Sequence, residues 1–149
     1  MRTELLDSVS ESFVTAVPLI KKNLLRSFSI DHIPFQLSRS NLEALFSLNE
    51  LRSASVSQLC NHLGISPPNM TPLIDKLVIN GLANRTTSTE DRRVVQIEIT
   101  EDGEQLCIDL QRRLAEQIRS KLDSLSDEDL IELRQCMRSL RNIASKIIG

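Results

Sequence analysis

The sequence of 149 residues lacks tryptophan and tyrosine, and four phenylalanines are its only large aromatic residues. Any hydrophobic core must therefore be mainly aliphatic. No apolar run approaches the roughly 18 residues of a membrane-spanning helix, and the first residues, MRTELLDSVSESF, include no apolar signal core. We therefore expect no membrane partner and no secretory signal, and the length suits one domain with a substantial core.

Cysteine and histidine are also scarce. Cys60, Cys107 and Cys136 are widely spaced and form no CxxC pair, which argues against a disulfide framework and suits the cytoplasm. Neither His32 nor His62 has a second ligand at metal-binding spacing. Since a Ser-His-Asp arrangement, a glycine-rich phosphate loop and a carboxylate pair are absent as well, we expect no metal site, no cofactor and no enzyme.

The chain has almost no excess charge, because 18 lysines and arginines oppose 20 acidic residues and leave a net charge of −2. Binding to nucleic acid must therefore depend on where a few cations are placed. Residues 38–100 carry six positive and six negative groups. The cations of this segment are Arg39, Arg52, Lys76, Arg85, Arg92 and Arg93.

Two short helices joined by a tight turn are predicted near the middle of the chain. Ser55 and Gln58 have capping-box spacing, and Gly64 is suited to end the first helix. Ser66 can cap a second helix that runs to Asn80. This spacing is typical of a helix-turn-helix. An earlier helix is expected to begin at a serine cap, residue 38.

A β-hairpin is predicted directly after the helix-turn-helix. In VVQIEIT, residues 94–100, the apolar residues Val95, Ile97 and Ile99 alternate with polar ones, which is the period of a strand. A helix-turn-helix followed by a hairpin predicts a winged helix. The fold class is therefore mainly α with a small β-wing, and the winged helix-turn-helix should occupy residues 37–100.

Amphipathic helices are predicted on both sides of this lobe, in residues 1–36 and 101–149. Helical spacing of apolar residues extends from Leu5 to Phe28, with a bend expected at Pro18, and Thr100 and Ser126 are suited to cap two later helices. These seams are longer than a small lobe can cover, so we expect dimerisation helices within a single domain, residues 1–149. The predicted dimerisation residues are Leu5, Val9, Leu133, Met137, Leu140, Ile143 and Ile147.

The sequence resembles the MarR family of bacterial winged-helix regulators over nearly its whole length. The resemblance is carried by SVSQLCNHLGISPPNMTPLIDKLVINGLANR, TSTEDRRVVQIEITEDGEQL and LSDEDLIELRQCMRSL. The family's D-x-R wing motif stands as residues 91–93, and its [LI]-T-x-x-G helix start as residues 99–103. The resemblance implies a homodimer that binds pseudo-palindromic double-stranded DNA, most often as a repressor, with the terminal helices interlocked across the two-fold axis.

The resemblance also suggests roles for individual residues. Arg93 is expected to read the minor groove, with Asp91 holding it and Arg92 contacting a phosphate. The outer face of the second helix is mostly uncharged, which suits the major groove; there Asn69 is the candidate for an adenine edge. Ser66, with the N–H groups of the helix start, is expected to hold a phosphate. The other expected DNA-binding residues are Arg39, Pro68, Thr71, Pro72 and Lys76.

A small-molecule effector is a further partner that the resemblance implies, bound between the dimerisation helices and the lobe. The residues expected to line its cleft are Phe13, Phe28, Phe35, Leu42 and Phe46. Two alternatives stay open. One is a redox-sensing regulator, although the peroxide-sensing branch places its reactive cysteine in the first helix, where this chain has none. The other is a winged-helix protein-interaction module without DNA binding, which the near-neutral central segment suggests.

Overall fold

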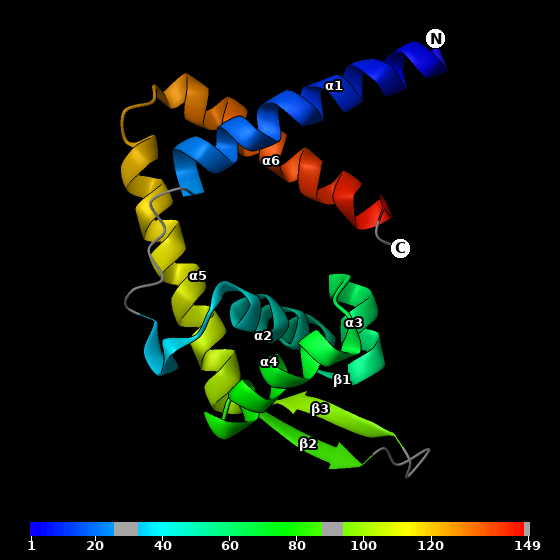
Figure 1. The fold of residues 1–149 in the computed structure, drawn as a ribbon. Helices are drawn as coiled ribbons and strands as arrows, with labels where there is room; N and C mark the ends of the chain where they lie inside the picture. The colour runs from blue at the N-terminus through cyan, green and yellow to red at the C-terminus, as the bar shows by residue number, and fades with distance from the viewer. Residues whose placement is uncertain (26–32, 88–93, 148–149) are drawn as a thin grey trace. The chain divides into compact units, whose positions relative to one another are not determined.

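The protein is represented by a computed structural model that describes residues 1–25, 33–87 and 94–147. The chain divides into two compact units, residues 1–27 with 115–149 and residues 28–114. The second unit contains short helices and a small antiparallel sheet (Figure 1). The mainly helical fold with a β-wing is therefore confirmed.

The elements of the second unit follow the predicted order, with one strand added. They are a 3-10 turn (Pro34–Gln36), α2 (Arg39–Leu51), β1 (Ser53–Ser55), α3 (Val56–Leu63), α4 (Pro67–Ile79), β2 (Ala83–Thr87), β3 (Val95–Ile99) and the first half of α5 (Glu101–Leu122). The added strand, β1, was not expected from the sequence. Helices α3 and α4 are the two helices of the predicted helix-turn-helix.

The predicted caps at Ser38 and Ser55 form, whereas the side chain of Ser66, also predicted as a cap, makes no capping hydrogen bond. The hydroxyl of Ser38 accepts a hydrogen bond from the Asn41 N–H (3.2 Å), and that of Ser55 accepts one from the Gln58 N–H (3.2 Å). Gln58 completes its capping box by accepting from the Ser55 N–H at 2.8 Å. Gly64 ends α3 in the left-handed region at φ 66°, where a side chain would add strain.

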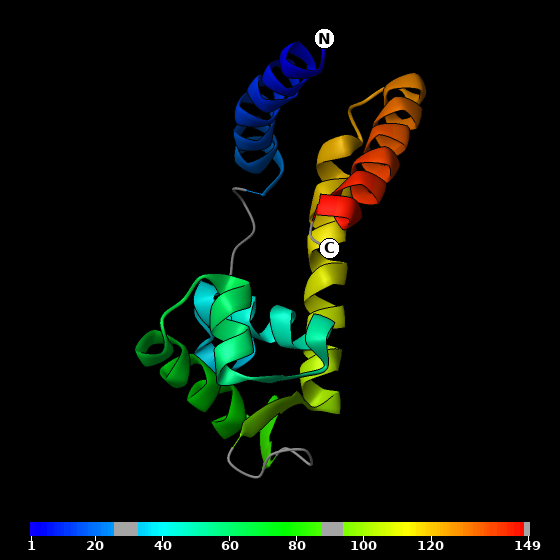
Figure 2. The same cartoon turned by 90° about the vertical axis from the view of Figure 1, so that its right-hand side faces the viewer.

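The sheet has the order β1-β3-β2, with all neighbours antiparallel. Ile97 lies at its centre, paired with Ala54 on β1 and Arg85 on β2, and its side chain is fully buried. Val95 shares the face of Ile97 but is 47% exposed, because it lies at the far end of the hairpin, beyond the core. In both views the hairpin lies beside the end of α4 (Figure 1, Figure 2).

The core of this unit is aliphatic, as the composition requires. It extends past residues 37–100 at both ends, because Ile33, Leu106, Cys107 and Leu110 are buried in it as well. Its largest fully buried side chains are Leu45, Leu48, Leu59, Met70, Ile74, Leu77, Leu82, Ile97 and Cys107.

The other unit contains α1 (Arg2–Ile20), a π-helical turn (Lys21–Leu25), the end of α5 and α6 (Asp127–Ile147). Pro18 lies inside α1, and the α-helix gives way to the π-turn at Lys21. The predicted helix is thus shorter than expected, because the missing N–H of Pro18 disturbs the hydrogen-bond ladder just before this point. The ammonium of Lys121 donates to the Asn23 carbonyl at 2.8 Å and so holds the end of the turn.

Neither α1 nor α6 buries any residue within the chain. Ser126 caps α6 as predicted, accepting from the Asp129 N–H at 3.1 Å. Among the described helices, none combines the length and the apolar character that a membrane crossing requires.

Candidate nucleic-acid interface

Helix α4 separates a buried face from an exposed one. Met70, Ile74 and Leu77 are at most 1% exposed and join the core, whereas the opposite face is open to solvent. The exposed residues include the predicted DNA contacts Pro68, Asn69, Thr71 and Pro72, with Pro67 and Ile79 also exposed; Lys76 is half-buried. The outer face thus presents short, mostly uncharged side chains, a shape that a major groove accepts.

The start of α4 offers fewer backbone donors than an ordinary helix start. Ser66 is the N-cap, but its side chain makes no capping hydrogen bond. Pro67 and Pro68 have no N–H, and the Asn69 N–H donates to the Ser66 carbonyl at 3.0 Å. The expected cradle of free N–H groups is therefore reduced, and the role of Ser66 in holding a phosphate remains a prediction.

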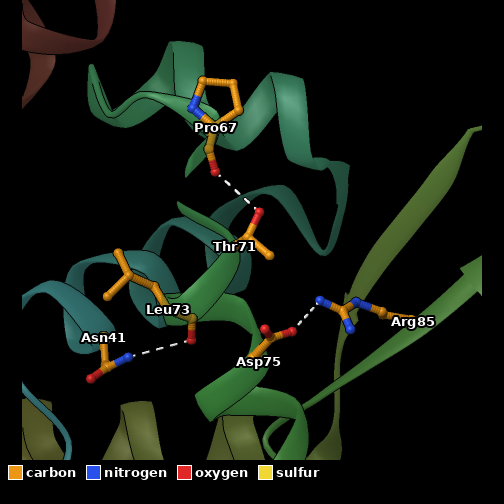
Figure 3. A network of polar contacts seen from close by, with 6 residues as sticks. All are labelled: Asn41, Pro67, Thr71, Leu73, Asp75 and Arg85. Carbon is orange, nitrogen blue, oxygen red and sulfur yellow. Dashed lines mark hydrogen bonds and ion pairs between the residues drawn. The ribbon is translucent and has the colours of Figure 1, made fainter. Parts of the chain in front are cut away.

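Two further polar side chains of α4 make contacts that Figure 3 shows. The Thr71 hydroxyl donates to the Pro67 carbonyl at 3.1 Å, one helical turn earlier. Asp75 forms an ion pair with Arg85 on β2, so it joins α4 to the first strand of the hairpin. This pair neutralises the one carboxylate of α4 and connects the helix directly to the wing.

A buried amide positions α4 from the opposite side. Asn41 on α2 is 5% exposed, and its side-chain N–H group donates to the Leu73 carbonyl at 3.3 Å (Figure 3). The oxygen of the same amide accepts from the N–H and the hydroxyl of Ser38, at 3.0 and 2.7 Å. Sequence reasoning missed Asn41, although its place three residues after a serine cap is a usable signal.

A second ion pair involves another cation of the central segment. Arg52, the C-cap of α2, pairs with Glu104 in the first turn of α5. The hydrogen bond and the negative charge of Glu104 raise the pKa of Arg52 above its usual range. Of the described cations in residues 38–100, Arg52 and Arg85 are thus engaged, and the other two, Arg39 and Lys76, form no ion pair with another described residue.

The wing tip itself, with Asp91, Arg92 and Arg93, lies outside the described residues. The hairpin that carries it is described as far as Thr87 and from Val94 onward. Across the hairpin, the Thr86 hydroxyl donates to the Glu98 carboxylate at 3.0 Å. The roles of the three tip residues remain predictions.

Comparison with known proteins decides the family. Residues 37–95 match the sequence model of the MarR family. The uncharacterized HTH-type transcriptional regulator YhbI of Bacillus subtilis is 30% identical over 111 residues, which span 74% of this chain and 72% of YhbI. The chain belongs to the MarR family.

Solved structures share the fold of this MarR protein. A MarR family protein from Bacillus stearothermophilus superimposes with a TM-score of 0.62 at 23% identity, over 96% of this chain and 92% of that one. RV1404 from Mycobacterium tuberculosis gives a TM-score of 0.75 at 16% identity, over 94% of each chain. In this MarR protein α3 and α4 form the helix-turn-helix, and β2 with β3 forms the wing of a DNA-binding transcriptional regulator.

The residues expected to line an effector cleft of this MarR protein differ from one another in how far they are buried. Phe13 and Phe35 are each 47% exposed, whereas Leu42 is buried and Phe46 packs partly against the core of the second unit. Phe28 lies outside the described residues. The effector site remains a prediction.

The cysteines of this MarR protein differ in access. Cys60 and Cys107 are buried, whereas Cys136 is exposed on α6. Burial, helped by the negative charge of Glu104, raises the pKa of Cys107 to about 11. The thiol of Cys107 is therefore protonated at neutral pH and is a poor nucleophile. In the described ranges, no three histidine, cysteine or acidic residues are grouped to hold a metal ion.

The buried thiol makes folding stability depend on alkaline pH. A folded-state pKa near 11, against the ordinary 9.0, stabilises the fold below pH 9, and this contribution is lost as pH rises toward 11. Between about pH 9 and about pH 11, we expect the free energy of unfolding of wild type to fall by about 2 kcal/mol more than that of Cys107→Ala. Urea unfolding of both proteins across this range measures it, and equal losses would contradict the assignment.

Proposed function

We propose that this MarR protein is a cytoplasmic, homodimeric repressor that binds a pseudo-palindromic operator and is released by a small molecule. One observation carries the proposal. The exposed face of α4 is short and almost uncharged, and the ion pair between Asp75 and Arg85 holds it beside the hairpin. A helix and a hairpin fixed in this way suit neighbouring grooves of one duplex.

Base contacts are assigned to the groups that can reach a base edge. Asn69 is exposed in the first turn of α4, and its amide can pair with the N6 and N7 positions of adenine in the major groove. Pro72 and the methyl group of Thr71 offer apolar contact to thymine. Arg93 at the wing tip enters the minor groove, where the negative potential is greatest, and Asp91 restrains it.

Phosphate contacts set the position of the protein on the duplex. We assign them to the Ser66 hydroxyl, to Arg92 and to the two cations without a described ion pair, Arg39 and Lys76. This small set suits a protein of net charge −2, whose attraction to DNA has to depend on a few cations.

The uncovered apolar faces of α1 and α6 support the homodimer. Leu5 and Val9 on α1 are 66% and 45% exposed, and Met137 and Ile143 on α6 are 52% and 53% exposed. Large apolar side chains exposed along two helices are typical of a surface that binds another protein chain. A two-fold dimer places its recognition helices in half-sites about 34 Å apart, and an effector that prefers another spacing releases the operator.

The test is the salt dependence of binding to an operator selected from random duplexes. We expect a steep fall in affinity with salt, whose logarithmic slope decreases in magnitude by about one for Arg93→Ala and for Lys76→Ala. Arg112→Ala, on α5 and paired with Asp109, is the control and should leave the slope unchanged. If selection recovers no operator, or the slope is flat, the proposal fails.

A protein-interaction module is the second candidate function. The observation that favours it is that Arg52 and Arg85, two of the few cations of the lobe, are already neutralised by Glu104 and Asp75. The same salt titration separates the two candidates, because this alternative predicts the flat slope.

A further inference from the structure

Helix α4 contains a proline at an interior position, where a proline disturbs the backbone. Pro72 lies inside α4, which begins at Pro67. Proline has no backbone N–H, so the regular hydrogen bond from residue 72 to the Pro68 carbonyl, one turn earlier, cannot form. The ring of an interior proline also crowds that carbonyl and turns it outward from the helix. The Pro68 carbonyl therefore has an accepting position that the regular helix does not use.

This carbonyl lies on the exposed face of α4. Pro68 and Pro72 are both exposed, and at about 100° per residue they lie within about 40° of each other, opposite the buried stripe. The exposed residues between them, Asn69 and Thr71, have short side chains. A base edge can therefore approach the backbone closely at this turn.

Two side-chain hydrogen bonds show how neighbouring carbonyls of α4 are used. The Thr71 hydroxyl donates to the Pro67 carbonyl at 3.1 Å, and such bonding to the preceding turn bends a helix further (Figure 3). The Asn41 amide donates to the Leu73 carbonyl at 3.3 Å, on the side of α4 that faces α2. A buried amide thus holds the inner side of the helix, whereas the outer side is opened at Pro68.

We propose that the Pro68 carbonyl accepts a hydrogen bond from the exocyclic amino group of a base in the major groove, either N6 of adenine or N4 of cytosine. These two amino groups are the donors that base pairs present in this groove. Guanine and thymine present acceptors instead, so a carbonyl at this place rejects them. The inference rests on the proposed function and adds a specificity contact to it. A backbone carbonyl also loses no side-chain rotamer freedom when it binds.

Pro72→Val tests the contact because it returns the missing N–H. The new N–H bonds the Pro68 carbonyl inside the helix, while valine keeps a branched apolar side chain on the outer face. Since proline is the least favourable residue inside a helix, the variant should fold at least as stably as wild type.

Selection from random duplexes, with the full chain of wild type and of Pro72→Val, measures the base preference at every operator position. We expect wild type to prefer adenine or cytosine by about fivefold or more at one position of each half-site that the variant no longer reads. At that position Pro72→Val should show a preference of about twofold or less, and its other preferences should be unchanged.

The matched control separates the N–H from the side chain. It carries α-hydroxyisovaleric acid at position 72, which has the side chain of valine but an ester oxygen in place of the N–H. The Pro68 carbonyl then stays open, so this chain should retain the wild-type base preference. A control that instead behaves like Pro72→Val shows that the proline ring sets the preference, and it overturns the inference.

Base analogues identify the amino group that is bound. One duplex replaces the preferred adenine by purine, which lacks the N6 amino group, and another replaces the preferred cytosine by pyrimidin-2-one, which lacks the N4 amino group. At the contacted position the analogue should weaken wild type about fivefold more than it weakens Pro72→Val. An equal loss in both proteins assigns the amino group to another contact and overturns the inference.

The outcomes also separate this inference from the proposed function. If selection recovers no operator for wild type, both fail. If an operator is recovered and Pro72→Val selects the same bases with the same preferences, DNA binding stands and the carbonyl contact is overturned. A preference lost at one position of each half-site in Pro72→Val, but kept in the ester control, supports the contact.

Discussion

Gly103→Ala is expected to destabilise the winged helix by about 3 kcal/mol or more, because its place in the fold leaves no room for a methyl group. A Cβ atom at this position would lie 2.2 Å from the Leu82 carbonyl oxygen and 2.8 Å from Cγ1 of Ile99. The carbonyl cannot move away freely, since Leu82 is buried and its oxygen accepts the Thr100 N–H at 3.1 Å. The first turn of α5 would have to move off the sheet.

Urea unfolding of Gly103→Ala against wild type measures this loss. Gly64→Ala is the matched control, because Gly64 has a positive φ but nothing within 4 Å of its missing Cβ. That variant introduces only local strain, about 1 kcal/mol. Should Gly103→Ala be no less stable than Gly64→Ala, the close approach of α5 to Leu82 is not the constraint described above.

Asn41→Leu is expected to lower the free energy of unfolding by about 2 to 4 kcal/mol, although leucine is of similar size and more apolar. The change removes the acceptor that caps the Ser38 N–H and the donor that bonds the Leu73 carbonyl. The Ser38 hydroxyl also loses the side-chain oxygen to which it donates at 2.7 Å, although it still accepts from the backbone N–H of residue 41. Since Leu73 lies on α4, we expect the recognition helix to be held less firmly on α2.

Thermal and urea unfolding of Asn41→Leu measure the loss, and operator affinity corrected for the folded fraction reports the effect on α4. Asn61→Leu, an exposed position on α3, is the control and should change stability by less than about 0.5 kcal/mol. Equal stabilities for the two variants would show that the buried amide of Asn41 contributes little.

Features set by neighbouring residues could be predicted from the sequence. Ser55 with Gln58, and the serine caps at residues 38 and 126, form because a short polar side chain meets an unpaired N–H two or three residues later. The strand around Ile97 could also be predicted from neighbouring residues, because the alternation of apolar and polar residues is visible within five positions.

Features that depend on residues distant in sequence could not be predicted in this way. β1 has only three residues, and it is a strand because Ala54 pairs with Ile97, more than forty positions later. The partner of Arg52 is Glu104, and nothing in either local sequence indicates it. The π-turn after Pro18 likewise depends on how the ladder of one helix adjusts to a missing donor.

The candidate site was predicted in part. The sequence indicated which face of α4 is exposed, because the buried stripe of Met70, Ile74 and Leu77 determines the opposite face. It did not indicate that Asp75 and Arg85 pair, because the turn between α4 and β2 has to form first. The sequence indicated that the double proline at the start of α4 suits a helix start. It did not indicate that the same prolines remove two N–H groups that could have bound a phosphate.

The order of the sheet bears on how this protein avoids aggregation. With β3 in the middle, β1 and β2 are edge strands whose outer backbone groups have no partner in the sheet. Such edges invite pairing with other chains. Here one edge is only three residues long, and the other, ANRTT, places a charged arginine at its centre and no large apolar residue. The wing can therefore project into solvent without acting as a template for fibrils.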